Sequence, residues 1–301
     1  MDPRMSDDLI QAAREIELAL PEVRVDRIEF LGAGMDSDAF LVNDGWVFRF
    51  PKRAEVGEAL RREIAVLPLL AARVPVAVPR FEYVGAQSNG LPFVGYRAIQ
   101  GEPLEAELFE GLSAVDRERA LTTLAGFLQG VHRFPVGQAD AMGVGRLSTR
   151  AWVSEAWDGA AQALPLLNAA TAASLRRMVE AFLTDEGNFE GAPTLLYADF
   201  APEHILFDLE TGRITGIIDW GDLAIGDPDF DLLYLRQDYG EPFVRELLRH
   251  YPHAEPERLL RKLRVFDACD HLNSIVGAVA EGDEAAVREW MEALGELAAA
   301  D

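Results

Sequence analysis

The first hundred residues change between helical and extended hydrophobic patterns. Apolar side chains recur at helical spacing from Met1 to Leu20, where Pro21 ends the pattern, and again from Val56 to Ala72. Alternating or short apolar runs bounded by turn residues predict strands over Val25–Leu31, Ala39–Val42, Trp46–Phe50, Val76–Val84 and Pro92–Ile99. The chain therefore begins with a β-rich region that contains two helices.

Beyond Gly101-Glu102-Pro103 the pattern becomes mostly helical. Helices are predicted over Leu121–Val131, Trp152–Leu167, Ala169–Leu183, Pro242–His250, Pro256–Val279 and Glu284–Ala299. Three short apolar runs, Leu195–Tyr197, Ile205–Phe207 and Ile214–Ile218, read as buried strands. We expect an α+β protein with a small N-terminal lobe, residues 1–100, and a larger C-terminal lobe, residues 101–301.

Composition restricts the protein class. Apolar residues make up 49% of the chain and charged residues 26%, as is usual for a globular protein. No apolar run approaches the roughly 20 residues that span a bilayer. The segment MDPRMSDDLI is polar and acidic, so we expect no secretory signal. Cys269 is the single cysteine, which excludes an intramolecular disulfide and a cysteine-cluster metal site. A cytoplasmic protein is the simplest expectation.

The net charge of −23 points to the kind of partner. Such an acidic surface repels nucleic acid and anionic membranes and concentrates cations, so it favours a cationic small-molecule substrate. Acidity that serves only solubility, or reflects the host's salt habits, gives the same composition. We expect a monomer that binds neither nucleic acid nor membrane.

Chemistry-bearing residues concentrate in Leu195–Leu235. Asp199 and Asp219 each follow a predicted strand, and His204 completes the spacing D-x-x-x-x-H. Protein kinases carry H-R-D-x-x-x-x-N followed by D-F-G, in which the first Asp faces the substrate hydroxyl and the Asn and second Asp hold Mg²⁺. A lone D-x-x-x-x-H is common by chance. With I-I-D-W-G-D and D-P-D-F-D following at the right distance, chance explains it poorly.

The N-terminal region carries a complementary set. The glycine-rich loop Gly32–Asp38 lies between two predicted strands, where backbone N–H groups can approach phosphate, although such a sequence also forms ordinary tight hairpins. Arg49 stands on the third predicted strand, where kinases place their phosphate-binding lysine. On the next helix, Glu63 is positioned to pair with Arg49, and Glu58 is the competing partner.

These residues together resemble the aminoglycoside phosphotransferases, which have a bilobal protein-kinase-like fold. The closest resemblance is to enzymes that phosphorylate the 2″-hydroxyl. It spans about residues 30 to 235 and is carried by L-G-A-G-M-D-S-D-A-F, W-V-F-R-F-P-K at Trp46–Lys52, P-F-V-G-Y-R-A-I-Q-G at Pro92–Gly101, F-L-Q-G-V-H-R-F-P at Phe127–Pro135 and the Leu195–Leu235 stretch.

The resemblance implies roles for individual residues of the central stretch. Asp199 would be the catalytic residue that orients the attacking hydroxyl, and His204 and Asp219 would hold Mg²⁺. Asp231, in D-P-D-F-D, would brace the catalytic loop. Phosphoryl transfer depends mostly on positioning and charge neutralisation, so few groups suffice.

The resemblance also implies two binding sites. The nucleotide, GTP or ATP, would be bound by Gly32, Gly34, Ser37, Arg49, Glu63, Tyr96, Ala98 and Ile99. The bulky Tyr96 would narrow the space beside the base and favour guanine. The cationic acceptor would be bound by carboxylates among Asp222, Asp238, Glu241, Asp267 and Asp270, with Asp222 preferred because it adjoins Asp219; the others also fit solvated helix faces.

Three positions depart from the family pattern. Tyr197 replaces the histidine that family members commonly carry two residues before the catalytic aspartate. Arg49 replaces the strand lysine, unless Lys52 takes that role; arginine is always charged and can bind phosphate bidentately. His204 replaces asparagine, and imidazole prefers softer metals than Mg²⁺.

The leading hypothesis is therefore a nucleoside-triphosphate-dependent, Mg²⁺-requiring aminoglycoside phosphotransferase. Two alternatives remain. The same fold could phosphorylate a macrolide, a sugar or an amino alcohol. The departures at Arg49 and Tyr197 also fit a nucleotide-binding pseudoenzyme.

Overall fold

The computed structural model describes residues 3–34, 36–160 and 163–299, and these divide into two compact units. The first contains residues 1–144 and 202–223, and the second contains residues 145–201 and 224–301. The central stretch identified in the sequence is therefore shared between the units. The predicted lobes, 1–100 and 101–301, do not coincide with this division.

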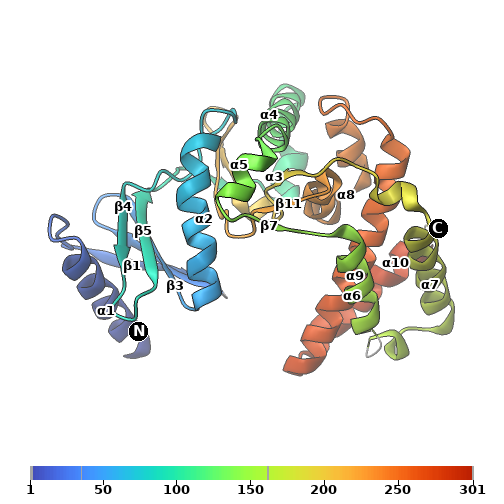
Figure 1. The fold of residues 1–301 in the computed structure, drawn as a ribbon, viewed down its shortest axis with the longest axis horizontal. Coiled ribbons are helices and arrows are strands. Elements are labelled where there is room, and N and C mark those ends of the chain that lie inside the picture. Colours follow the sequence, from blue (N-terminus) through green and yellow to red (C-terminus); the bar gives the residue numbers. More distant parts are fainter. Residues whose placement is uncertain (1–2, 35, 161–162, 300–301) are drawn as a thin grey trace. The chain divides into compact units, whose positions relative to one another are not determined.

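A five-stranded antiparallel sheet forms the N-terminal part of the first unit (Figure 1). Its strands, in spatial order, are β1 (Ile28–Ala33), β2 (Ser37–Val42), β3 (Trp46–Pro51), β5 (Pro92–Arg97) and β4 (Tyr83–Ala86). Helix α1 (Pro3–Ala19) packs Ala12 and Ile16 against Phe48 and Phe50 on one face. Helix α2 (Ala54–Leu70) meets Arg49 on the opposite face. The strand predicted over Trp46–Phe50 is confirmed as β3.

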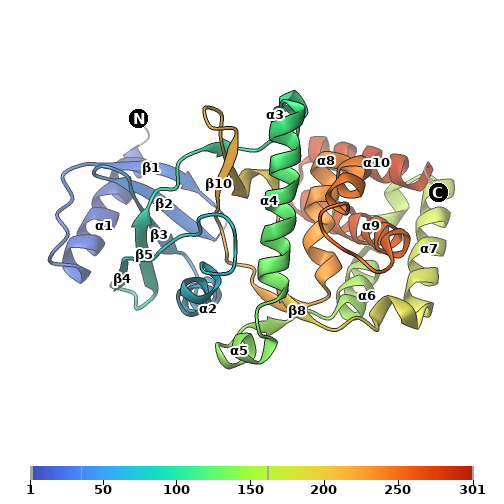
Figure 2. The same ribbon diagram turned by 90° about the horizontal axis from the view of Figure 1, so that it is seen from above.

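The rest of the first unit surrounds a second, three-stranded sheet. Its strand order is β10 (Arg213–Ile217), β9 (Ile205–Asp208) and β6 (Glu102–Pro103). The helical elements are α3 (Ala106–Gly111), α4 (Ala114–His132), α5 (Val136–Ala141) and the 3₁₀ turn η4 (Pro202–His204). Helix α4 packs beside β10 (Figure 2). It begins seven residues before the predicted start because Ser113 caps it, accepting a hydrogen bond from the Asp116 N–H.

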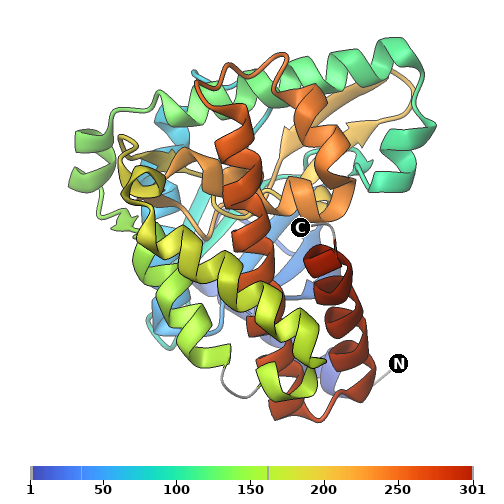
Figure 3. The same ribbon diagram turned by 90° about the vertical axis from the view of Figure 1, so that its right-hand side faces the viewer.

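The second unit is mostly helical. Its helices are α6 (Thr149–Gly159), α7 (Ala169–Thr184), α8 (Leu233–Leu247), α9 (Pro256–Glu281) and α10 (Glu284–Ala299), with 3₁₀ turns η2 (Leu164–Leu166), η3 (Glu186–Phe189) and η5 (Pro228–Leu232). The unit also contains a small sheet, whose strands in spatial order are β7 (Gly145–Arg146), β11 (Ala224–Gly226) and β8 (Thr194–Leu196). Helix α9 packs against α6, α7 and α10 (Figure 3). Leu175, Leu272 and Leu294 belong to one apolar core among these helices.

The predicted α+β class is confirmed, but two element predictions are wrong. Val76–Val84 is not one strand: Ala77 forms an isolated bridge to Gly216, and β4 begins only at Tyr83. Pro75 and Pro79 flank that bridge and have no N–H to continue a ladder.

Helix α8 consists of two helices that meet at Gly240, where φ is 83°. The part after Gly240 corresponds to the predicted helix Pro242–His250, whereas the part that begins at Leu233 was not predicted. Glycine readily adopts a positive φ, and Pro242 has no N–H to continue the helical ladder, so the two helices separate here. The predicted helix Trp152–Leu167 is interrupted after Gly159 by η2 around Pro165, and residues 161–162 lie outside the described ranges.

No helix within the described ranges is long and apolar enough to cross a membrane.

A histidine at the α9–α10 contact is expected to make the folded protein less stable at acidic pH. His271 packs against Trp290 with ring centroids 5.1 Å apart, and burial, reinforced by Arg236, lowers its pKa to about 4. An unfolded histidine titrates near 6.5, so the unfolded chain binds a proton that the folded chain excludes. This stability is present above pH ~6.5 and is lost as the pH falls towards 4.

When the pH falls from 7.5 to 4.5, we expect the free energy of unfolding to decrease in both proteins, but by about 2 kcal/mol less in His271→Leu than in wild type. Urea unfolding of both proteins at the two pH values measures this difference. Equal losses in the two proteins would show that His271 is not the acid-sensitive group.

Candidate active site

A buried ion pair joins the sheet to helix α2. The Arg49 guanidinium on β3 pairs with the Glu63 carboxylate on α2, and their side chains are 15% and 2% exposed. Burial raises the pKa of Glu63, and the Arg49 charge opposes that shift. The predicted Arg49–Glu63 pair is confirmed. The competing candidate, Glu58, pairs instead with Arg61 at 2.5 Å.

Arg49 also extends towards the D-W-G turn. Its Nη1 lies 3.4 Å from Oδ1 of Asp219. The Asp219 backbone is left-handed, with φ of 55°, which costs a non-glycine residue conformational energy and is held only where surroundings fix it. Trp220 supplies that hold: it is buried, donates its indole N–H to the Ile217 carbonyl at 3.0 Å, and packs on Phe127.

His204 and Asp219 form the candidate metal pair. The His204 Nε2 lies 3.9 Å from Oδ2 of Asp219, and the Ile218 N–H donates to the His204 carbonyl at 3.0 Å, which ties η4 to the end of β10. The residues that the structure describes contain no group of three or more His, Cys, Asp or Glu side chains able to hold a metal. Asp219 supplies the carboxylate that Mg²⁺ prefers, and water and phosphate oxygens would fill its other positions. His204 can add a neutral imidazole, a ligand that suits softer metals better.

The glycine-rich loop is held by cations from the end of β3. The Lys52 ammonium donates to the Gly34 carbonyl at 2.8 Å and pairs with Asp38 at 2.9 Å, while Arg53 pairs with Asp36. The Gly34 N–H donates to the Ser37 carbonyl at 3.0 Å, and Met35 lies outside the described residues. Lys52 therefore serves the loop, and Arg49 alone occupies the strand position beside Glu63.

The predicted hinge follows β5. Tyr96 is buried, and burial raises its pKa to about 12. The Ala98 N–H already donates to the Gly45 carbonyl at 2.9 Å, so that amide is committed within the unit. The next predicted base-pocket residue, Ile99, is half-buried. Gly101 has φ of 145°, and a Cβ there would lie 2.9 Å from Thr215 Oγ1, so glycine is required where the chain crosses β10.

In the second unit, a single carboxylate fixes the loop that carries Asp199. Asp231, 1% exposed, accepts the Tyr197 N–H at 3.0 Å and the Ala198 N–H at 2.7 Å. Ala198 is left-handed, with φ of 69°, and the half-buried Asp199 follows it. The predicted bracing role of Asp231 is confirmed.

Tyr197 explains how the loop tolerates its departure from the family pattern. Its ring is fully buried and packs edge to face with Phe200 at 5.6 Å. The loop is anchored through the Tyr197 and Ala198 backbone amides, so the contacts with Asp231 do not require a histidine side chain at position 197.

The predicted acceptor carboxylates have separate surroundings. Asp222 lies in the first unit, and its pKa is raised by partial burial and by Asp219. The others lie in the second unit, where Asp238 is exposed. Glu241 pairs with Arg245 at 2.9 Å, and the buried Asp267 pairs with Arg236. Asp270 accepts from Gln237 at 3.1 Å, and burial raises its pKa. The geometry gives Asp267 a structural role.

One buried charge network was not predicted from the sequence. Lys262 on α9 pairs with Asp227 and Asp229, which lie at the start of η5 before Asp231, and His253 Nε2 lies 3.0 Å from Asp229 Oδ1. The sequence carries one signal for it: a lysine stands among the leucines of R-L-L-R-K-L, and the residues three and four positions further along α9 are buried. Its partners could not be read from sequence because they are more than 30 residues away.

Comparison with known proteins gives one family. Residues 27–266 match the model of the phosphotransferase enzyme family. The chain is 25% identical over 230 residues to the uncharacterized protein YcbJ of Bacillus subtilis, covering 73% of each. It is 32% identical to APH(2″)-IIIa, solved with GDP and kanamycin, with a TM-score of 0.90 over 97% of this chain and 99% of that one.

A weaker likeness extends to macrolide enzymes. The macrolide 2′-phosphotransferase MphH from Brachybacterium faecium is 24% identical, with a TM-score of 0.68, and covers 96% of this chain and 98% of its own. At that identity the likeness shows the fold alone. The architecture is protein-kinase-like, as expected from the sequence.

The Asp231 bracing yields a stability prediction. Asp231→Ala would leave one buried amide, Tyr197, and one partly buried amide, Ala198, without their acceptor, so we expect a loss of about 2–4 kcal/mol in the free energy of unfolding. Urea denaturation measures it. The exposed Asp158→Ala serves as control, with an expected change below about 0.5 kcal/mol. Equal small effects from both variants would contradict the bracing role.

Proposed function

Because the chain belongs to the phosphotransferase enzyme family, we propose that it transfers the γ-phosphate of a nucleoside triphosphate to a hydroxyl group of an aminoglycoside. The observation that carries the proposal is the Asp199 loop held by Asp231, in a chain that also presents the Arg49–Glu63 pair beside Asp219. Support comes from the 32% identity to APH(2″)-IIIa, whose structure contains GDP and kanamycin.

In this proposal Asp199 acts on the acceptor. Its carboxylate accepts a hydrogen bond from the acceptor hydroxyl, orients it in line with the γ-phosphorus and takes its proton as the new O–P bond forms. The bond between the γ-phosphorus and the β–γ bridging oxygen breaks, and the nucleoside diphosphate leaves. Holding the loop rigidly matters because such transfer depends on geometry more than on covalent chemistry.

The nucleotide is assigned to the first unit. Gly32, Gly34 and Ser37 would face the phosphates, Arg49 would contact phosphate oxygens, and Tyr96, Ala98 and Ile99 would line the base pocket for GTP or ATP. Since the Ala98 N–H is committed to Gly45, we assign base pairing at the hinge to other backbone groups of 98–100. His204 and Asp219 would hold Mg²⁺, which when bound neutralises charge on the transferring phosphate.

The acceptor is assigned by charge. Aminoglycosides are polyamines, and a chain of net charge −23 attracts polycations. Asp222, Asp238, Glu241 and Asp270 are the carboxylates proposed to bind the amines. Among the second-unit members, Asp270 lies partly buried on α9, where a bound ammonium group would stabilise its ionised form.

Turnover tests this proposal directly. Purified protein with Mg²⁺ and kanamycin or gentamicin should release nucleoside diphosphate from GTP or ATP and yield a phosphorylated aminoglycoside detectable by mass spectrometry. Asp199→Ala should lower kcat by several orders of magnitude, and Asp199→Asn by a similar factor, because the amide cannot take the proton.

The exposed Asp158→Ala serves as the control, with wild-type kcat expected. A macrolide, a sugar and an amino alcohol belong in the same screen with both nucleotides. Turnover only on one of those acceptors would reassign the substrate, and nucleotide binding without any turnover would refute the proposed transfer.

A second experiment separates Arg49 from Lys52. If Arg49 is the phosphate contact, Arg49→Lys should raise KM for the nucleotide at least about tenfold, since the shorter side chain must serve both Glu63 and phosphate. Lys52→Met should raise it less, because Lys52 is held by Gly34 and Asp38. The opposite ranking would assign the phosphate contact to Lys52.

A further inference from the structure

Lys262 is a buried cation that the proposed reaction does not use. It lies on α9 and is 6% exposed, and its ammonium meets Asp227 Oδ2 and, at 2.5 Å, Asp229 Oδ2. A cation is retained in such a position only where it is paired, and here it has two carboxylate partners.

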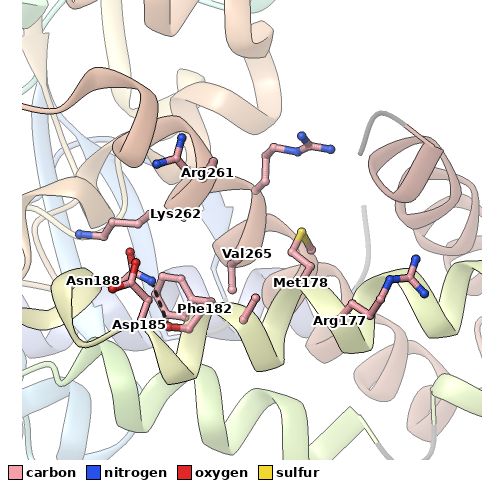
Figure 4. A pocket seen from close by; sticks show the side chains of 10 residues that line it. Arg177, Met178, Phe182, Asp185, Asn188, Arg261, Lys262 and Val265 are labelled. Carbon is pink, nitrogen blue, oxygen red and sulfur yellow. Dashed lines mark hydrogen bonds between the residues drawn. The ribbon is translucent and has the colours of Figure 1, made fainter.

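The cavity beside Lys262 does not account for the charge. A cavity of about 390 Å³ between α7 and α9 is lined by Met178, Phe182 and Val265, among others, and Lys262 also contributes to its lining. Figure 4 shows the ammonium directed away from Phe182 and Val265. Arg261 lines the same cavity and is exposed. The Lys262 ammonium therefore serves the aspartates.

Those aspartates fix the turn η5 at its beginning. Asp227 caps η5, its Oδ1 accepting the Asp229 N–H at 3.1 Å, while its other oxygen meets Lys262. Asp229 is held on one oxygen by Lys262 and on the other by His253. With both carboxylates anchored to one ammonium, the position of η5 is set relative to α9.

The same turn ends in the group that holds the catalytic loop. Asp231 lies two residues after Asp229, and its carboxylate accepts the Tyr197 and Ala198 amides immediately before Asp199. A displacement of η5 would therefore move both acceptor oxygens, and Ala198 could leave its left-handed conformation.

We propose that Lys262 is a positioning residue: by anchoring Asp227 and Asp229 it sets η5 and Asp231, and so the placement of Asp199. This inference rests on the proposed function for its kinetic consequence. The structural link itself does not require that function.

The kinetic test compares Lys262→Met with Arg261→Met, a matched change at the adjacent exposed position. We expect Lys262→Met to lower kcat for aminoglycoside phosphorylation about 10- to 100-fold, with KM for the nucleotide unchanged within twofold, because the residues assigned to nucleotide binding lie in the other unit. Lys262→Arg should recover most of the lost kcat, and Arg261→Met should match wild type.

Lys262→Met leaves two carboxylates without their cation and can fail to fold. The double variant Lys262→Met/Asp227→Asn removes the excess negative charge. If Lys262 serves only to balance charge, this variant regains wild-type kcat, which would overturn the proposal. If Lys262 positions the turn, kcat stays low because the shared anchor is still missing.

Hydrogen exchange gives a readout that needs no substrate. The Tyr197 and Ala198 amides should exchange at least about tenfold faster in the double variant than in Arg261→Met, while β3 and β5 keep wild-type rates. Unchanged exchange at both amides would overturn the proposal. If wild type shows no turnover on any acceptor, the proposed function fails, and the exchange comparison still decides whether Lys262 holds the loop.

Discussion

This site depends on one constraint: a single buried carboxylate accepts hydrogen bonds from two consecutive backbone amides. Asp231 accepts hydrogen bonds from the Tyr197 and Ala198 N–H groups and so holds Ala198 in a left-handed conformation. Without that hold the Ala198 backbone would return to a more favourable conformation. Charge-assisted bonds to amides are strong, and a buried carboxylate that lost them would be costly, so the turn and the carboxylate stabilise each other. Because the backbone is fixed at Ala198, the direction of the next side chain, Asp199, is fixed as well.

A second constraint acts in the first unit through a chain of charges. Glu63 is buried and needs a cation; Arg49 supplies it and reaches Asp219 as well. Because Arg49 offers several donors in one plane, it can hold a carboxylate on one side and leave others for phosphate, which a lysine ammonium does less well. The replacement of the family's lysine by arginine is thus consistent with a phosphotransferase, and Lys52 holds the glycine-rich loop instead.

Much of this was predictable from local pattern. The strand at Trp46–Phe50 followed from its hydrophobic pattern, whereas the Arg49–Glu63 pair followed from the protein-kinase pattern and the bracing by Asp231 from the resemblance. Errors arose where proline changed a local pattern, at Val76–Val84 and around Pro165. The Lys262 network was not predicted because its members are far apart in sequence. In addition, a single buried lysine produces no hydrophobic periodicity that would reveal its burial.

The sequence by itself determined the identity and order of the chemical groups: Gly32 to Asp38, Arg49, Glu63, Asp199, His204 and Asp219 follow one another in the order of the protein-kinase pattern. Only the tertiary structure decided which groups are already engaged. It assigned Lys52 to Gly34 and Asp38, the Ala98 amide to Gly45, Asp267 to Arg236, and Lys262 to Asp227 and Asp229. The reason is physical: a motif records which groups are present, whereas pairing and burial depend on partners that folding brings from distant parts of the chain.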